Sequence, residues 1–196
     1  MQNWIRRCST LAVLALAATA ATAAPASAQS VSYGILAGAS FSDMMNTDFT
    51  ATTSTGFAGG LYAGIPLKTS LVLEPELLYT NKGANIEGAS ATVNLNYIEI
   101  PVLLRYNFNS DGGPFAYVGP YVGFNMDCNT TTPLATVNCS DASVNANTVF
   151  GGALGVGFQK SAWGFDLRYE YDFTDAVDSG PGKNSTFMAL LRLAVK

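Results

Sequence analysis

The side chains in this sequence that are suited to catalysis are carboxylates, because the chain contains no histidine. That absence excludes Ser-His-Asp and Cys-His catalysis and any metal site built on histidine ligands. Two carboxylate pairs have the residue types needed for general acid and base catalysis, namely Glu74 with Glu76 and Asp166 with Glu170. In each pair the spacing is even, so both members share one face of a β-strand.

The segment that holds the second pair reads WGFDLRYEYDF over 163–173. Its odd positions are aromatic or apolar, and its even positions are glycine or charged. This period of two predicts a strand with two unlike faces. In a soluble sheet the charged face meets water, whereas in a membrane barrel the aromatic face meets lipid and the charged face points inward.

Eight segments show this alternation, and turn-forming sequence separates them. They are 31–41, 55–66, 71–81, 93–108, 114–125, 148–159, 163–173 and 185–196. Short connections alternate with long ones, and the long ones are 42–54, 82–92, 126–147 and 174–184. A tilted strand of this length covers about 26 Å of depth, close to the ~25 Å apolar band of an outer membrane. The sequence therefore predicts an all-β fold, an eight-stranded antiparallel transmembrane β-barrel with short periplasmic turns and four longer extracellular loops.

The N-terminus is typical of a secretory signal peptide over 1–28. A positively charged start and an apolar run at 11–19 precede small residues that end at Ala28. Cleavage between Ala28 and Gln29 leaves 29–196 as the outer-membrane β-barrel domain.

Charge and composition exclude several classes of function. The net charge of −4 argues against nucleic-acid binding, and the long connections are acidic. Only 12% of the residues are charged, against about a quarter in soluble domains. No segment after the signal peptide has 18 consecutive apolar residues, so no transmembrane helix is predicted. An exported, charge-poor chain of this kind fits a barrel in the bacterial outer membrane.

The charged strand faces form the predicted interior. An eight-stranded barrel is just wide enough to be filled by side chains, and buried charge is costly unless it is paired. We therefore interpret these residues as a salt-bridge network with Arg168 near its middle, and we predict no catalytic role, metal or cofactor. The network comprises Glu74, Glu76, Glu99, Arg105, Asp166, Arg168, Glu170, Asp172 and Arg192.

The opposite faces carry aromatic residues that we expect to meet lipid, with Trp163 and Phe173 marking the two interfacial belts. The set comprises Tyr79, Tyr106, Phe124, Phe150, Phe158, Trp163, Phe165, Tyr169, Tyr171, Phe173 and Phe187.

Three prolines, Pro75, Pro101 and Pro120, fall inside predicted strands. Proline removes a hydrogen-bond donor from a sheet, so we expect a β-bulge beside each one. Such a bulge would reverse the inward and outward faces beyond it.

Two cysteines lie in the third long connection, Cys128 and Cys139. In an oxidising compartment this pair is expected to form a disulfide, and the alternative is two free thiols.

Several stretches, among them LEPELLYTNKG at 73–83, NYIEIPVLLRY at 96–106 and GFDLRYEY at 164–171, also carry a resemblance to a family. The motif PELLY followed by N-Y-x-E-I-P is the most specific part. The chain resembles the outer-membrane β-barrel domain family, often labelled porin-family protein, and is similar to the small eight-stranded barrels of the OmpX and OmpA type. The resemblance implies an integral outer-membrane protein and brings no catalytic residues.

The leading functional hypothesis is an outer-membrane barrel with a structural or surface-interaction role, in which the loops are the working part. Its expected partners are outer-membrane lipid, the outer-membrane assembly machinery and an extracellular surface partner, and we expect a monomer. The alternatives are a periplasmic lipocalin-like barrel with its apolar faces inward, a surface adhesin and a small-solute channel.

Overall fold

The computed structural model describes residues 31–45, 51–86, 91–110, 112–139, 146–177 and 182–195. The predicted signal peptide at 1–28 and its cleavage site lie outside the described residues, as do parts of all four long connections. Within the described ranges, no helix has the length and apolar composition needed to cross a membrane.

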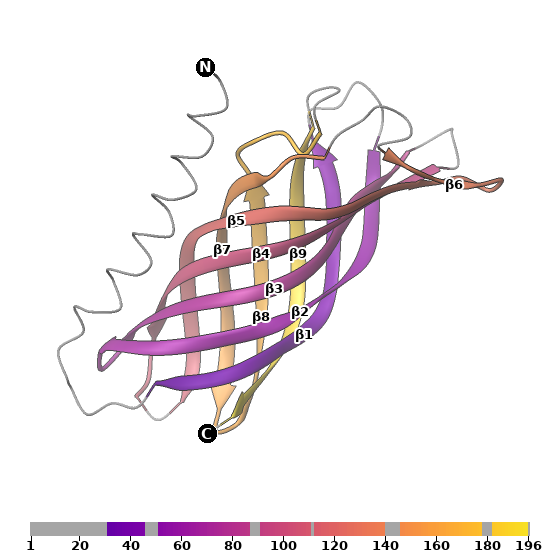
Figure 1. Ribbon diagram of the computed structural model, residues 1–196. Helices are drawn as coiled ribbons and strands as arrows, with labels where there is room; N and C mark the ends of the chain where they lie inside the picture. The colour runs from indigo at the N-terminus through magenta and orange to yellow at the C-terminus, as the bar shows by residue number, and fades with distance from the viewer. Residues whose placement is uncertain are drawn as a thin grey trace, which may run out of the picture. The chain divides into compact units, whose positions relative to one another are not determined.

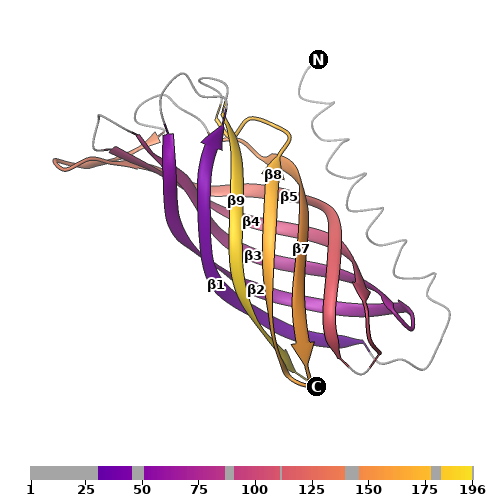
Figure 2. The same cartoon turned by 180° about the vertical axis from the view of Figure 1, so that it is seen from behind.

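The described chain forms one antiparallel sheet that closes on itself (Figures 1 and 2). Its strands are β1 (Ser32–Met45), β2 (Ala51–Lys68), β3 (Leu71–Ile86), β4 (Ala91–Asn107), β5 (Gly113–Thr131), β6 (Thr136–Asn138), β7 (Val149–Lys160), β8 (Trp163–Asp172) and β9 (Lys183–Val195). The sheet order is β4-β3-β2-β1-β9-β8-β7-β5-β6, and pairing between β4 and β5 closes the ring. The predicted eight-stranded barrel is confirmed. The addition is β6, which pairs only with β5 and forms a hairpin beyond the ring.

The strands differ in length around the barrel. On one side β3, β4 and β5 have 16, 17 and 19 residues, whereas β7 and β8 on the other side have 12 and 10. We call the end with the short connections the turn end, and the end with the long connections the loop end. The long strands and the β5–β6 hairpin extend past the short strands at the loop end (Figure 1).

These extensions correct the predicted boundaries of the long connections. Lys82 was assigned to a loop at 82–92 but lies inside β3, and Lys183, assigned to 174–184, begins β9. The reason is that apolar residues stop alternating with polar ones at this level, although the backbone ladder continues. The strand predicted from the alternation of residues therefore ends before the strand defined by backbone hydrogen bonds.

The prediction of bulges beside the three prolines is wrong. Pro75 pairs with Val102, Pro101 with Tyr121 and Pro120 with Gly152, and the register is the same on both sides of each proline. The register shifts lie elsewhere, at Thr53/Ala58, Pro66/Lys68 and Asn96/Tyr97. The alternation of faces is therefore kept through all three prolines.

The two faces of the barrel have opposite character. Large apolar side chains are exposed on the outer face of every strand of the ring, whereas charged and aromatic side chains are buried inside. This arrangement is the reverse of the one that a lipocalin-like barrel requires, and it contradicts that alternative.

Candidate functional site

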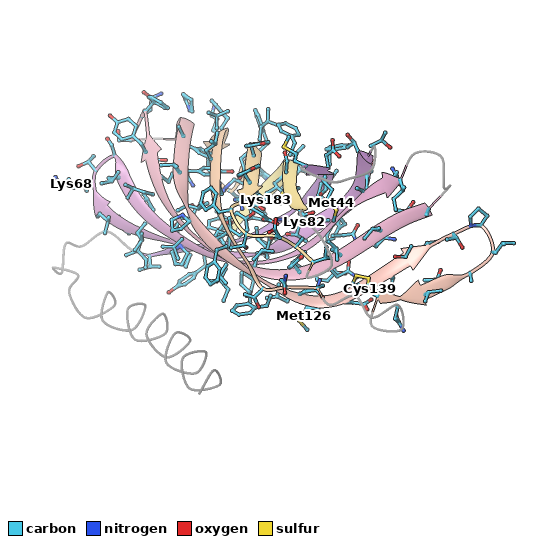
Figure 3. All side chains as sticks on the ribbon, turned by 90° about the horizontal axis from the view of Figure 1, so that it is seen from above. Met44, Lys68, Lys82, Met126, Cys139 and Lys183 are labelled. Atoms are coloured by element: carbon cyan, nitrogen blue, oxygen red, sulfur yellow. A yellow bond between two sulfur atoms is a disulfide. The ribbon has the colours of Figure 1, made fainter. Side chains whose placement is uncertain are left out.

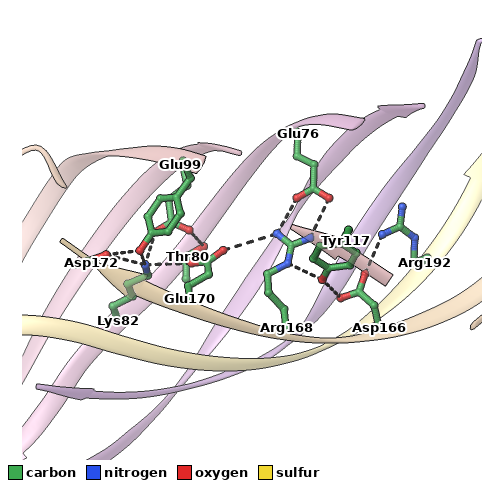
Figure 4. Close-up of polar contacts among 11 residues, drawn as sticks. Glu76, Thr80, Lys82, Glu99, Tyr117, Asp166, Arg168, Glu170, Asp172 and Arg192 are labelled. Atoms are coloured by element: carbon green, nitrogen blue, oxygen red, sulfur yellow. Dashed lines mark hydrogen bonds and ion pairs between the residues drawn. The ribbon is translucent and has the colours of Figure 1, made fainter. Parts of the chain in front are cut away.

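All nine charged residues of the predicted network project into the barrel, from β3, β4, β8 and β9. Eight of them are at most 4% exposed, and Arg105, near the turn end, is partly exposed. Figure 4 shows the central part of the network, and Figure 3 shows all side chains from above, with Lys82 labelled. The arrangement follows from the even spacing along each strand, which returns every second side chain to the interior.

The half of the network nearest the turn end joins two arginines through Glu74. Arg105 Nη1 lies 3.0 Å from Glu74 Oε2, and Arg192 Nη2 lies 2.8 Å from Glu74 Oε1. Arg192 also donates from Nη1 to Asp166 Oδ2 at 2.8 Å. The guanidinium groups of Arg105 and Arg192 pack over the ring of Phe115, at 4.0 and 5.3 Å from its centroid.

Arg168 occupies the middle of the network. Its two terminal nitrogens donate to the two oxygens of Glu76, at 2.7 and 2.8 Å, and this bidentate pair is fully buried. Its Nε donates to the Tyr117 hydroxyl at 2.9 Å, and that hydroxyl donates to Asp166 at 3.0 Å. Tyr117 therefore links the pair in the middle to the half at the turn end.

The half nearest the loop end gathers three carboxylates around Lys82. Its Nζ lies 2.6 Å from Glu99, 3.1 Å from Glu170 and 3.7 Å from Asp172. Tyr121 bonds to Asp172 and packs against the ammonium, 4.8 Å from the ring centroid, while Asn184 donates to Asp172 at 2.9 Å.

Sequence reasoning missed Lys82, Tyr117 and Tyr121. A signal for Lys82 was present, because it continues the even series of Glu74 and Glu76 along one strand. The hydroxyl groups of Tyr117 and Tyr121 link charged groups through contacts across the barrel. Such contacts cannot be read from the spacing within one strand.

A row of glycines in β7 makes room for these aromatic rings. Gly151, Gly155 and Gly157 stand opposite Tyr121, Tyr117 and Phe115 in the β5–β7 register. A Cβ atom at any of the three would lie 2.3–2.4 Å from the facing ring. Packing against the interior rings thus explains Gly151, Gly155 and Gly157.

We expect Gly155→Ala to lower the free energy of unfolding by about 1–3 kcal/mol, because overpacking displaces a buried ring. The added methyl would lie 2.4 Å from the Tyr117 hydroxyl oxygen and so disturb its bonds to Arg168 and Asp166. Urea unfolding of the protein in lipid vesicles measures the change. Gly152→Ala is the matched control on the outer face, where the nearest atom is the end of the Phe173 ring at 3.0 Å. An equal loss in both variants would contradict the explanation.

The two candidate acid–base pairs are occupied by cations. Glu74 is held by Arg105 and Arg192, and Glu76 by Arg168. In the second pair, Asp166 contacts Arg192 and Glu170 contacts Lys82. Among the described residues, no group of three or more His, Cys, Asp or Glu side chains has the geometry to hold a metal ion.

The predicted lipid-facing aromatics lie on the outer face. Ten of the eleven are exposed, with Trp163 at 67% and Phe173 at 60%, and Tyr171 is half-buried. Phe158 and Phe165 stack, with ring centroids 6.4 Å apart, and Tyr171 and Phe173 pack as a tilted pair at 6.1 Å.

Cys128 and Cys139 form a disulfide with their Cα atoms 5.4 Å apart. The bond joins the base of the β5–β6 hairpin, which extends to one side of the ring at the loop end (Figure 3). At the tip of the hairpin, Leu134 is 97% exposed.

A closed eight-stranded ring with an apolar exterior and a paired charged interior defines the class of small outer-membrane β-barrels. Residues 27–178 match the outer membrane protein beta-barrel domain family, and the chain belongs to that family in the bacterial outer membrane. No curated protein matches the sequence.

Two solved structures show the same fold. Ail, the attachment invasion locus protein of Yersinia pestis, is 15% identical with a TM-score of 0.55, and the match covers 85% of this chain and 100% of Ail. Neisserial surface protein A is also 15% identical with a TM-score of 0.55, and the match covers 84% and 99% of the two chains.

Proposed function

We propose that this protein is a monomeric, non-enzymatic outer-membrane barrel whose closed interior is structural and whose loop end binds a partner at the cell surface. Removal of the signal peptide at 1–28 and insertion by the outer-membrane assembly machinery are parts of the same proposal. The observation that carries it is the interior itself, which is occupied along its length by paired, buried charged side chains.

The filled interior supports a structural role over a channel or an enzyme. Arg168 and Glu76 cross the middle of the barrel as a fully buried bidentate pair. A solute would have to separate this pair without replacing its hydrogen bonds, which is costly in a low dielectric. The same contacts leave the carboxylates of Glu74 and Glu76 without room for a substrate.

The loop end supports a surface role. The hairpin is fixed at its base by the disulfide and presents Leu134, an exposed apolar side chain whose burial against a partner would be favourable. Asp43, Asp127 and Asp175 make the described part of this end acidic. Ail has been solved in complex with the heparin analogue sucrose octasulfate, a polyanion. The acidic residues here favour a neutral or cationic partner.

We expect Leu134→Ser to weaken attachment of expressing cells to a surface partner by roughly tenfold, because burial of the apolar side chain is lost. The measurement is attachment of cells that display the protein to immobilised host-cell or neighbouring-cell surface extracts. Leu67→Ser, at an exposed leucine of the opposite end, is the control and should attach normally. Undiminished attachment by the Leu134 variant, with equal surface display, would reject the tip as the binding element.

A further inference from the structure

The outer face of β3, β4, β5 and β6 carries three cross-strand rows of small polar side chains near the loop end. In the register, Asn81 pairs with Asn96 and Asn96 with Asp127, which gives the first row. The second row is Gly83, Asn94, Asn129 and Asn138, and the third is Asn85, Thr92, Thr131 and Thr136. We call these three rows the amide face.

The direction of the amide face follows from its neighbours along β4. Leu95 and Tyr97 are fully buried inside the barrel, so Asn94 and Asn96 alternate with them and point outward. The residues paired with them in β5 and β6 share that outward face.

The amide face continues directly from the apolar exterior. One step toward the turn end from its first row, Tyr79 pairs with Ile98 and Ile98 with Phe124. Tyr79 and Phe124 are 40% and 37% exposed, and below them the outer face is apolar. In β3 and β4 the outer face changes within two residues from this row to the first amide row, and in β5 the exposed Met126 lies between Phe124 and Asp127. The change marks the edge of the hydrocarbon on this side of the barrel.

The side chains of the amide face favour one kind of ligand chemistry. Its ten side chains are amides, hydroxyls and a single carboxylate, without a lysine or arginine. Some members hold one another in place: Asn81 donates to Asn96 at 2.6 Å, Thr92 to Asn85 at 2.8 Å and Asn129 to Asp127 at 2.6 Å. An ordered array of amides offers both donors and acceptors, which is the chemistry that sugar hydroxyls require, whereas phosphate groups would require cations.

The height of the amide face fits the same ligand. Four residues separate its first and last rows, so it rises roughly 13 Å along a strand above the aromatic row. On the opposite side of the ring, β8 ends at Asp172, one residue before the exposed Phe173. Among the described residues, the tall polar wall therefore lies on the side of β3 to β6, facing sideways into the layer just above the hydrocarbon.

We propose that the amide face binds the headgroup sugars of the glycolipid in the surrounding outer leaflet. The occupant is the lipid-linked saccharide, because the face lies beside the leaflet and is continuous with the lipid-contacting surface. The inference rests on the outer-membrane location and is independent of the surface partner proposed for Leu134.

The test compares the folded protein with the triple variant Asn94→Ala/Asn129→Ala/Asn138→Ala. Both are extracted from the outer membrane into a sugar-free detergent and titrated with lipooligosaccharide, and bound glycolipid is counted by native mass spectrometry. We expect the variant to bind roughly tenfold more weakly, since about three hydrogen bonds are lost. Binding of lipid A stripped of its outer sugars should be equal for the two proteins.

The control is Thr69→Ala/Ser70→Ala/Asn109→Ala, which removes three polar side chains from the turn end. It should bind lipooligosaccharide like the unchanged protein. Asn94→Ser/Asn129→Ser/Asn138→Ser puts hydroxyl groups in place of the amides, so it keeps hydrogen-bonding groups and should recover part of the affinity. Heat-dependent gel mobility confirms that each variant is folded. Unchanged binding in the alanine variant, an equal loss for stripped lipid A, or a preference for free oligosaccharide over the lipid-linked form would overturn the proposal.

Discussion

Replacing Lys82 with methionine should lower the free energy of unfolding by about 3–5 kcal/mol, the range found when one partner of a buried ion pair is removed. The side chain is fully buried and faces Glu99, Glu170 and Asp172 at 2.6–3.7 Å. Methionine has a similar length and fills most of the same space, so the loss measures charge more than packing.

The size of the effect comes from what the variant leaves behind. Three carboxylates would face one another in a region that water does not reach, and the nearest other cation, Arg168, is 3.7 Å from Glu170 and already engaged with Glu76. An uncompensated buried charge costs more than its pair contributes, because desolvation is no longer offset.

The measurement is urea unfolding in lipid vesicles, followed by tryptophan fluorescence. Lys160→Met, an exposed lysine at the turn end, is the matched control and should change stability by less than about 0.5 kcal/mol. Adding Glu99→Gln and Glu170→Gln to Lys82→Met should recover much of the loss. Equal stability of the two lysine variants would show that Lys82 does not hold the three carboxylates together.

Lys82 also shows where prediction from the sequence ends. The inward charged face can be predicted from the even spacing of residues such as Glu74 and Glu76 in one strand, and Arg168 and Glu170 in another. This spacing is visible within each strand by itself. Lys82 lies an even number of residues after Glu76 and so shares its face. Asn81 beside it is also polar, so apolar and polar residues no longer alternate here and the pattern does not predict that the strand continues. The amide face is hidden for the same reason.

Pairing between strands is a second limit. The sequence places Arg168 in the interior, but it does not show which carboxylate Arg168 contacts. The partner, Glu76, is 92 residues away in the sequence and meets Arg168 only because the closed barrel brings their strands to face each other. The prediction of bulges at Pro75, Pro101 and Pro120 was wrong for a related reason, because it too left out the pairing between strands. Each proline was assessed alone, whereas the ladder tolerates it when flanking pairs hold the register.

Replacing Arg168 with methionine is expected to cost a comparable 3–5 kcal/mol of unfolding free energy. The substitution leaves the two oxygens of Glu76 without their bidentate partner and the Tyr117 hydroxyl without its donor. Because Tyr117 also bonds to Asp166, the disturbance should reach the half of the network near the turn end.

A double-mutant cycle separates the pair from its surroundings. Glu76→Met alone should also destabilise, because it leaves the buried guanidinium of Arg168 without its anionic partner. Arg168→Met/Glu76→Met removes both charges, and an apolar pair of similar volume should be far less harmful than either single change suggests. Additive losses in the cycle would mean that Arg168 and Glu76 contribute independently.

A second double substitution at the same two positions tests whether the pair closes the barrel. Single-channel conductance in planar bilayers should remain near the background for the unchanged protein, because the bidentate pair and its neighbours fill the cross-section. In Arg168→Ala/Glu76→Ala, which removes the charges and most of the volume, we expect discrete small conductance steps, since water can then enter between Lys82 and Arg192. Large steps in the unchanged protein would contradict the closed interior. A silent double alanine variant that is folded would instead assign the closure to Tyr117 and the rings around it.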